Sequence, residues 1–142
     1  MEVRTFQPAD LFAIAVQEAQ AEARSIISTP GYGEALAKAG PSFTATCNGE
    51  VVACAGVITQ WPGNARAWAI LSESAGKCML TLTRAIRTWL RFHNDGRIDC
   101  AVQCDFAESV RWARLLGFEL EGTMRAYTPE RRDCFLFAQV VT

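Results

Sequence analysis

Excess charge, long apolar runs and histidine are all scarce in this sequence, and each shortage excludes a class of protein. A formal net charge of −1 over 142 residues gives no bulk attraction to nucleic acid or to an anionic membrane. No apolar stretch approaches the ~20 residues of a membrane-spanning helix. Arg4, Gln7 and Asp10 interrupt the apolar core that an N-terminal signal peptide needs. We therefore expect a cytoplasmic protein with no membrane partner.

Metal sites and disulfide frameworks are not expected either. The six cysteines form no C-x-x-C pair, and the single histidine, His93, belongs to no Cys/His cluster. Structural zinc needs four such ligands in a compact pattern. Most of the cysteines lie in apolar segments, where cysteine behaves as a small buried hydrophobe. We expect no metal, and six reduced thiols that are mostly buried.

The order of the predicted elements indicates one mixed domain. Half of the residues are hydrophobic, and 142 residues are enough to bury a core. The segments follow in the order strand, helix, short helix, three antiparallel strands, helix, strand, helix and two strands. No repeat or long linker interrupts them. This order predicts a single domain over residues 1–142, of α/β (α+β) class and built around one sheet.

The first half of the chain carries periodicity and turn signals. Apolar residues recur at helical spacing from Pro8 to about Ser25, which predicts one helix there. A short second helix is expected over Glu34–Ala39. The dipeptide Asn48-Gly49 lies between two β-prone runs, 42–47 and 50–58, and favours a type I′ hairpin because both turn positions need a positive φ.

A strand that leads into a helix organises the second half. Ala65–Leu71 is predicted to be a strand, Ser72–Gly76 a polar loop, and Lys77 to about Phe92 a helix. The first turn of a helix leaves backbone N–H groups unpaired and carries a partial positive charge, so it can bind phosphate without a charged side chain. The next strand, Ile98–Cys104, should run parallel to the first because a helix connects them.

Capping signals bound the last helix. Asp105 is expected to cap its start, with Glu108 completing a capping box. Gly117 is expected to end it, and Phe118 to supply the hydrophobic contact that follows a C-cap glycine. Two final strands are predicted after this glycine.

Three of these features together resemble the Gcn5-related N-acetyltransferase (GNAT) superfamily. They are the Asn48-Gly49 hairpin, the strand-loop-helix from Leu71 to Met79, and the helix that ends in Leu116-Gly117-Phe118. The resemblance covers nearly the whole chain. It implies a central mixed, mostly antiparallel sheet of about six or seven strands, with about four helices on both faces. It also implies acetyl-CoA or CoA as cofactor and an amine or peptide as acceptor.

In that family the backbone amides of a Q/R-x-x-G-x-G/A loop hold the pyrophosphate of the cofactor. The matching stretch keeps the central glycine as Gly76, but Glu73 replaces Gln or Arg, and Cys78 replaces Gly or Ala. A carboxylate repels a pyrophosphate unless it points away, and the charge of Lys77 offsets part of this repulsion. The residues that the resemblance implies for cofactor binding are Leu71, Ser72, Ser74, Ala75, Gly76, Lys77 and Cys78.

The catalytic groups of the family are not matched. Many members have an asparagine near the start of the last helix, and a tyrosine near its end that protonates the departing thiolate. Phe106 and Ala113 stand at those positions, and neither donates a proton from its side chain. Asp99 and Asp105 are the possible general bases, but Asp99 is expected to face solvent and Asp105 to be used as a cap. Tyr127 is the remaining candidate acid by residue type.

Two functions therefore stay open. The first is an acyl-CoA-dependent N-acetyltransferase, or an acyl-CoA-binding protein with a degenerate catalytic site. The second is a non-catalytic protein on the same fold. From Trp68 to Phe137 the sequence is similar to GNAT-like internal virion proteins of short-tailed bacteriophages, through Ser74–Lys77, the basic helix after it and Arg111-Trp112. This resemblance implies a phage origin, a location in the virion or the host cytoplasm, and virion proteins as partners.

Nucleic-acid binding is a third and less favoured interpretation. It would use a stripe of arginines at helical spacing, whereas such a stripe is more often a solvated helix face. The stripe consists of Arg84, Arg87 and Arg91.

Overall fold

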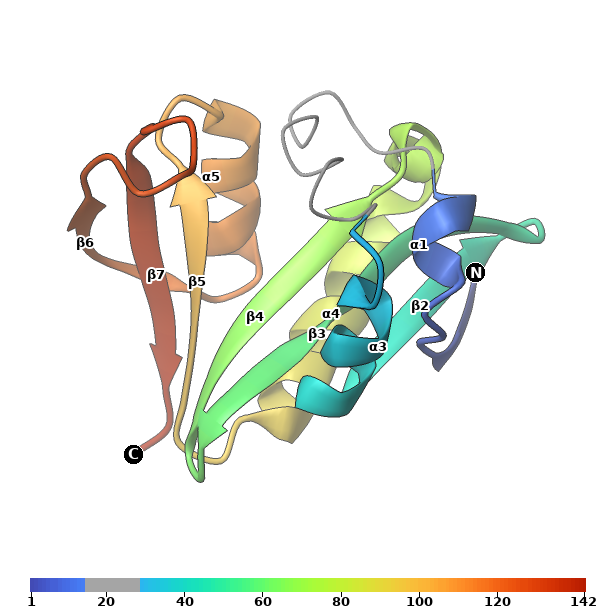
Figure 1. The fold of residues 1–142 in the computed structure, drawn as a ribbon, viewed down its shortest axis with the longest axis horizontal. Coiled ribbons are helices and arrows are strands. Elements are labelled where there is room, and N and C mark those ends of the chain that lie inside the picture. The colour runs from blue at the N-terminus through green and yellow to red at the C-terminus, as the bar shows by residue number, and fades with distance from the viewer. Residues whose placement is uncertain (15–28) are drawn as a thin grey trace. The chain divides into compact units, whose positions relative to one another are not determined.

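The computed structural model describes residues 1–14 and 29–142. They form a seven-stranded mixed sheet in the order β1-β2-β3-β4-β5-β7-β6, with four α-helices and a 3-10 helix (Figure 1). No helix formed by these residues is long and apolar enough to cross a membrane. The strands are β1 (Glu2–Thr5), β2 (Ser42–Cys47), β3 (Glu50–Trp61), β4 (Asn64–Leu71), β5 (Arg97–Gln103), β6 (Glu119–Met124) and β7 (Cys134–Val140). The helices are α1 (Asp10–Ala13), α3 (Tyr32–Ala39), η2 (Glu73–Cys78, 3-10), α4 (Met79–His93) and α5 (Ala107–Leu115).

The predicted fold class is confirmed. The ladders β1–β2, β2–β3, β5–β7 and β6–β7 are antiparallel, and β4–β5 is parallel. The parallel ladder pairs Asn64–Arg66 with Arg97–Asp99. The expected parallel relation of these two strands is therefore correct, and it follows from the helical crossover between them.

The chain divides into two compact units. The first comprises Met1–Thr59 and Ala67–Leu82, and the second comprises Gln60–Arg66 and Thr83–Thr142. β3, β4 and α4 contribute residues to both units. The single domain expected from the sequence stays a prediction.

The hairpin of the first unit forms as its sequence predicts. Asn48 and Gly49 have φ values of 53° and 79°, and Cys47 pairs with Glu50 across the turn. These are the two positive φ angles of a type I′ turn. The hairpin therefore places the end of β2 and the start of β3 at one tip.

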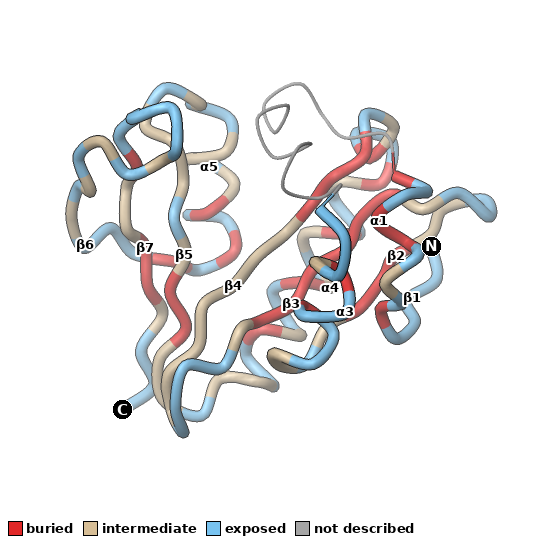
Figure 2. The backbone as a smooth tube through the Cα atoms, viewed as in Figure 1, coloured by how far each residue is buried: buried red, intermediate tan, exposed pale blue. Residues whose placement is uncertain are grey.

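An apolar cluster joins the helices of this unit to its strands. Phe6 packs edge-to-face on Trp68, with ring centroids 5.4 Å apart. Burial of each large apolar side chain contributes about 1.5–3 kcal/mol. Red segments in Figure 2 mark the buried parts of β3 and of the end of β4. The buried members of the cluster are Phe6, Leu11, Ile14, Leu36, Cys54 and Ile70.

The prediction of one continuous helix from Pro8 to about Ser25 is wrong. α1 ends at Ala13, and Ile14 has an extended backbone with φ −96° and ψ 130°. Ile14 is only 8% exposed and belongs to the apolar cluster, so tertiary packing overrides the helical periodicity there. The rest of the predicted helix lies outside the described residues. The short second helix is confirmed as α3, which begins at Tyr32.

A buried carboxylate connects β1, α1 and β2. Asp10 receives two hydrogen bonds of 2.8 Å from the Arg4 guanidinium and one of 2.7 Å from the Thr44 hydroxyl. The backbone N–H of Gln7 donates a fourth at 2.9 Å. Burial alone would raise the pKa of Asp10, but these hydrogen bonds outweigh it and hold the pKa below its usual value.

In the second unit α5 packs on β5 and ends as predicted. Gly117 has a φ of 98°, its N–H donates to the Arg114 carbonyl, and the N–H of Phe118 donates to the Ala113 carbonyl. This pair of hydrogen bonds is a Schellman motif, which a glycine accommodates without strain. Phe118 is buried, as the motif requires of its hydrophobic contact.

The predicted start of α5 is wrong. The N-cap position is Phe106, and no side chain caps the helix. The Asp105 carboxylate instead accepts a hydrogen bond of 2.9 Å from Arg132. The Asp105 carboxylate, which the local sequence predicts to cap the helix, is therefore paired with an arginine from a distant segment.

Candidate functional site

The stretch after β4 is helical where a loop was predicted. β4 ends at Leu71, Ser72 is the N-cap of η2, and η2 covers Glu73–Cys78. α4 follows directly and begins at Met79 rather than Lys77. The predicted loop over Ser72–Gly76 is therefore wrong. Ser72 provides the physical reason, because its side chain accepts the N–H of Ser74 and starts a turn.

Backbone amides of this stretch are already hydrogen-bonded within it. The N–H of Ser74 donates to Ser72 Oγ at 3.1 Å, and the N–H of Ala75 donates to the Ser72 carbonyl at 3.1 Å. In a 3-10 helix each later N–H donates to the carbonyl three residues before it, which engages the amides of Gly76, Lys77 and Cys78. A bound anion would have to compete with these hydrogen bonds.

The seven residues expected to bind cofactor differ in access. Gly76 and Lys77 are exposed and Ser74 is half-buried. A side chain added at Gly76 would meet no atom within 4 Å, so the backbone at Gly76 is open to an approaching ligand. The members whose side chains are buried are Leu71, Ser72, Ala75 and Cys78.

Two carboxylates add negative charge to this stretch. Ser72 Oγ lies 2.9 Å from Ser74 Oγ, and Ser74 Oγ donates to Glu50 Oε1 at 3.0 Å. Glu50 belongs to the β2–β3 hairpin tip, and Glu73 is exposed within η2 itself. Lys77 is the nearby cation in the sequence. The local charge at this stretch is therefore less favourable for binding a pyrophosphate than it would be with Gln or Arg at position 73.

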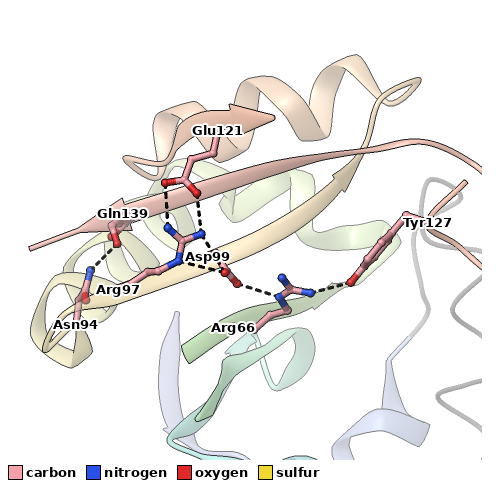
Figure 3. Close-up of polar contacts among 7 residues, drawn as sticks. All are labelled: Arg66, Asn94, Arg97, Asp99, Glu121, Tyr127 and Gln139. Atoms are coloured by element: carbon pink, nitrogen blue, oxygen red, sulfur yellow. Dashed lines mark hydrogen bonds and ion pairs between the residues drawn. The ribbon is translucent and has the colours of Figure 1, made fainter. Parts of the chain in front are cut away.

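Tyr127, the candidate acid, lies in the connection between β6 and β7 of the second unit. Its side chain is 46% exposed. Nη1 of Arg66 donates to its hydroxyl oxygen at 2.7 Å (Figure 3). Because the oxygen accepts from Arg66, the O–H proton of Tyr127 stays available to another acceptor.

Arg66 also binds Asp99, and this corrects the expectation that Asp99 faces solvent. Asp99 is 6% exposed, and its Oδ1 accepts from Arg66 Nε at 2.9 Å. Its Oδ2 accepts from Arg97 Nη2 at 3.2 Å. Arg97 in turn holds Glu121 with hydrogen bonds of 2.7 and 2.9 Å. Both carboxylate oxygens of Asp99 are therefore engaged, which removes it as a candidate general base.

The charged network raises the pKa of both arginines. For Arg66 the main cause is the hydrogen bond to Asp99, and for Arg97 it is the hydrogen bond to Glu121. Sequence reasoning missed both arginines. One signal was present: Arg97 and Asp99 are two residues apart on a strand, so their side chains share a face.

Other candidates from the sequence have ordinary structural surroundings. The His93 ring stacks on Trp89 with centroids 4.0 Å apart, and its Nδ1 lies 2.8 Å from the Trp89 carbonyl oxygen. Among residues 1–14 and 29–142, no three His, Cys, Asp or Glu side chains gather as a metal site would need. All six cysteines are free, three of them buried and three half-buried. The arginines of the exposed stripe on α4 are Arg84, Arg87 and Arg91.

Comparison with solved structures identifies the fold. Ard1 from Thermoplasma volcanium superposes with a TM-score of 0.79 at 18% identity, covering 99% of this chain and 97% of that one. A GNAT-family acetyltransferase from Streptococcus pneumoniae has a TM-score of 0.68 at 17% identity and covers 99% of both chains. The putative acetyltransferase yncA from Salmonella typhimurium, solved with its cofactor acetyl-CoA, has a TM-score of 0.67 at 16% identity and covers 99% and 94%.

Comparisons by sequence give no match. No model of a known protein family fits the chain, and no curated protein is similar to it. The structural likeness therefore establishes the GNAT acetyltransferase fold and leaves the activity to be argued from this chain's own residues.

Proposed function

We propose, from the premise that the chain has the fold of GNAT acetyltransferases, that it binds acetyl-CoA or CoA weakly and transfers an acetyl group to an amine or peptide. The observation that carries the proposal is the open backbone at Gly76, at the position of the family's central glycine, with the exposed Lys77 beside it. The strand that leads into a helix at this point supports it, because α4 begins one residue after η2.

Only part of the Leu71–Cys78 stretch suits an anionic cofactor. Lys77 and the exposed backbone of Gly76 would hold the pyrophosphate, and the partial positive charge at the start of α4 would add to their attraction. When bound, acetyl-CoA supplies the acetyl thioester. The carboxylates of Glu50 and Glu73 weaken the site, so we propose a low affinity.

Tyr127 is proposed as the proton donor to the departing thiolate. Arg66 fixes its hydroxyl oxygen and leaves its proton free to be donated. The residue that occupies the family's tyrosine position, Ala113, is 3% exposed and has no donor. General acid help is typically worth ~10²–10⁴-fold in rate, so a Tyr127→Phe variant should turn over more slowly by a factor in that range.

Thermal unfolding with added CoA or acetyl-CoA tests the binding step. Ligand at ~100 times its Kd stabilises a protein by ~2.7 kcal/mol, which corresponds to a rise in Tm of about 5–10 °C for a chain of this size. Gly76→Val should reduce the shift, because the added side chain fills the open edge. Gly122→Val is the matched control, since Gly122 also has no atom within 4 Å of an added side chain and lies in β6.

Turnover is measured by mass spectrometry of acetylated amines and peptides. This readout is preferred to thiol detection because the protein carries six cysteines of its own. A Tm shift that Gly76→Val leaves unchanged would contradict binding at this stretch. A specific shift without product on any acceptor would retain the binding site and remove the transferase step.

A non-catalytic interaction protein is the second candidate. The engaged amides of η2 and the two carboxylates at the stretch favour it. Virion proteins of short-tailed phages are the partners that this reading proposes, on the basis of the sequence resemblance. It becomes the better proposal if millimolar acetyl-CoA gives no shift with either wild type or a variant that removes the charge of Glu73.

A further inference from the structure

The arginine stripe of α4 (Arg84, Arg87 and Arg91) lies on a helix that contains no Asp or Glu. All three arginines are exposed, whereas Ile86 and Leu90 are buried on the opposite face of the helix. Residues three and four apart share one face of a helix. The three guanidinium groups therefore belong to one surface that extends about 10 Å along the helix axis.

The positive charge of this stripe is not neutralised nearby. Within residues 1–14 and 29–142, no carboxylate forms an ion pair with any of its three arginines. Even the exposed Asp95, four residues after the last of them, is not paired with the stripe. Arg87 instead donates to the backbone carbonyl of Leu115, at the end of α5, at 3.3 Å. A net charge of −1 for the whole chain thus hides a local surface of positive charge, to which an anionic partner is attracted.

An exposed aromatic ring lies at the end of the stripe. Phe92 directly follows Arg91 and is 85% exposed. Its ring meets the His93 ring edge-to-face with centroids 5.1 Å apart, and the His93 ring stacks on Trp89 with centroids 4.0 Å apart. Nδ1 of His93 also donates to the Trp89 carbonyl at 2.8 Å. Neighbouring rings therefore support Phe92 while most of its surface remains open to a ligand.

We propose that the arginine stripe and Phe92 form a binding surface for single-stranded nucleic acid. Guanidinium groups suit phosphate because their N–H donors can bind two of its oxygens at once. At ~3.4 Å per nucleotide, the stripe matches about three phosphates of one strand. Phe92 offers a ring on which an unpaired base can stack, as in proteins that bind single strands without reading their sequence.

Phe92 also favours a single strand over other anionic partners. The bases of a duplex are already stacked on one another, and an acidic polypeptide has no bases. This surface goes beyond the proposed acetyl transfer, and none of its residues belongs to the Leu71–Cys78 stretch.

Fluorescence anisotropy with the full chain and a labelled oligothymidylate tests the charge of the surface. With three phosphates neutralised, the logarithm of the binding constant should fall with the logarithm of the salt concentration with a slope of about −2. Arg84→Gln and Arg91→Gln should each weaken binding and reduce the size of this slope by about 0.7. Arg125→Gln is the matched control, because it removes one exposed arginine from the β6–β7 connection and should leave affinity and slope unchanged.

A second set of variants tests the stacking. Phe92→Ala should weaken binding about 5- to 100-fold and leave the salt slope unchanged, because stacking releases no counterion. Phe92→Trp should retain the affinity, and circular dichroism spectra that match wild type show that each variant is folded.

Three results would overturn the proposal. They are equal losses from Arg125→Gln and the stripe variants, an unchanged affinity in Phe92→Ala, and a preference for another anion. That preference would be seen as tighter binding of a duplex, or as displacement of the strand by polyglutamate as effectively as by unlabelled oligothymidylate. None of these measurements uses CoA, so the proposed function stands or fails separately.

Discussion

Nε of Arg66 donates to Oδ1 of Asp99 at 2.9 Å, and the two residues are also the last pair of the parallel ladder between β4 and β5. Asp99 shares its other oxygen with Arg97 from its own strand. The side chains thus reinforce the register that the backbone sets. A slip of one residue would turn Asp99 to the opposite face of the sheet and leave both arginines without it.

Asp99→Asn should therefore destabilise the protein strongly. The variant leaves Arg66 and Arg97 without their shared carboxylate, and we expect a loss on the order of 2–4 kcal/mol, below the full penalty of a buried pair because the arginines are partly exposed. Urea unfolding measures the change. Asp105→Asn is the control, because its ion pair with Arg132 is about half exposed on both sides and should be worth ~0–1 kcal/mol. Equal effects of the two substitutions would refute this account.

Asp10 makes the free energy of unfolding depend on pH in the acid range. Its pKa is held below the usual value of 3.8 in the folded state, so the unfolded state binds a proton at a higher pH than the folded state does. The resulting stabilisation is fully present above about pH 5 and is lost as the pH falls through the lowered pKa. Asp10→Asn should be less stable than wild type at pH 7, and the gap should narrow toward pH 3.

Urea unfolding at pH 7, 5, 4 and 3 provides the comparison for Asp10. The exposed Asp95 supplies the control, and Asp95→Asn should track wild type through the series. A gap between wild type and Asp10→Asn that stays constant down to pH 3 would contradict the hydrogen-bonded carboxylate as its source.

Local signals predicted the parts of the fold that local geometry decides. Asn48-Gly49 forms its type I′ turn because both positive φ angles are available to that pair. Gly117 ends α5 for the same kind of reason. In each case the residues on which the prediction rests also form the turn or the helix end.

Features that depend on distant partners were not predicted. Asp99 pairs with Arg66, which is 33 positions away, and the sequence contains no signal of that distance. Asp105 was expected to cap α5 but binds Arg132, 27 positions away. Ile14 matches the helical period but is held extended by the core. For the candidate site, the sequence alone predicts the positions of Gly76 and Lys77. That the backbone amides of η2 are already hydrogen-bonded follows only from the structure.

A hydrogen bond between α5 and α4 offers a double-mutant cycle within the second unit. Trp112 Nε1 donates to Thr83 Oγ1 at 2.9 Å. Thr83→Val leaves the half-buried indole N–H without this acceptor and should cost about 1–3 kcal/mol, while the net value of the bond itself is about 0.5–1.5 kcal/mol. Trp112→Phe also removes apolar contact area. In the Trp112→Phe background Thr83→Val should therefore cost clearly less, and additive losses in urea unfolding would show that the bond contributes nothing.

Glu73→Gln should improve CoA binding. The substitution keeps the size of the side chain and restores a residue type that the family has at this position, and it removes one negative charge from a stretch that also contacts Glu50. A unit charge within ~6 Å of one anionic charge in water costs about 0.7 kcal/mol, so we expect Kd to fall about three- to tenfold for a pyrophosphate. Titration calorimetry with CoA at 50 mM salt measures it. At 1 M salt the Kd values of the two proteins should converge, because the Debye length is then ~3 Å.

Glu130→Gln is the control for Glu73→Gln. It lies on the exposed β6–β7 connection, changes the net charge equally and should leave the Kd for CoA unaltered. An equal gain from Glu130→Gln would assign the effect to net charge, and no gain from Glu73→Gln in a protein that does bind CoA would place the cofactor away from η2.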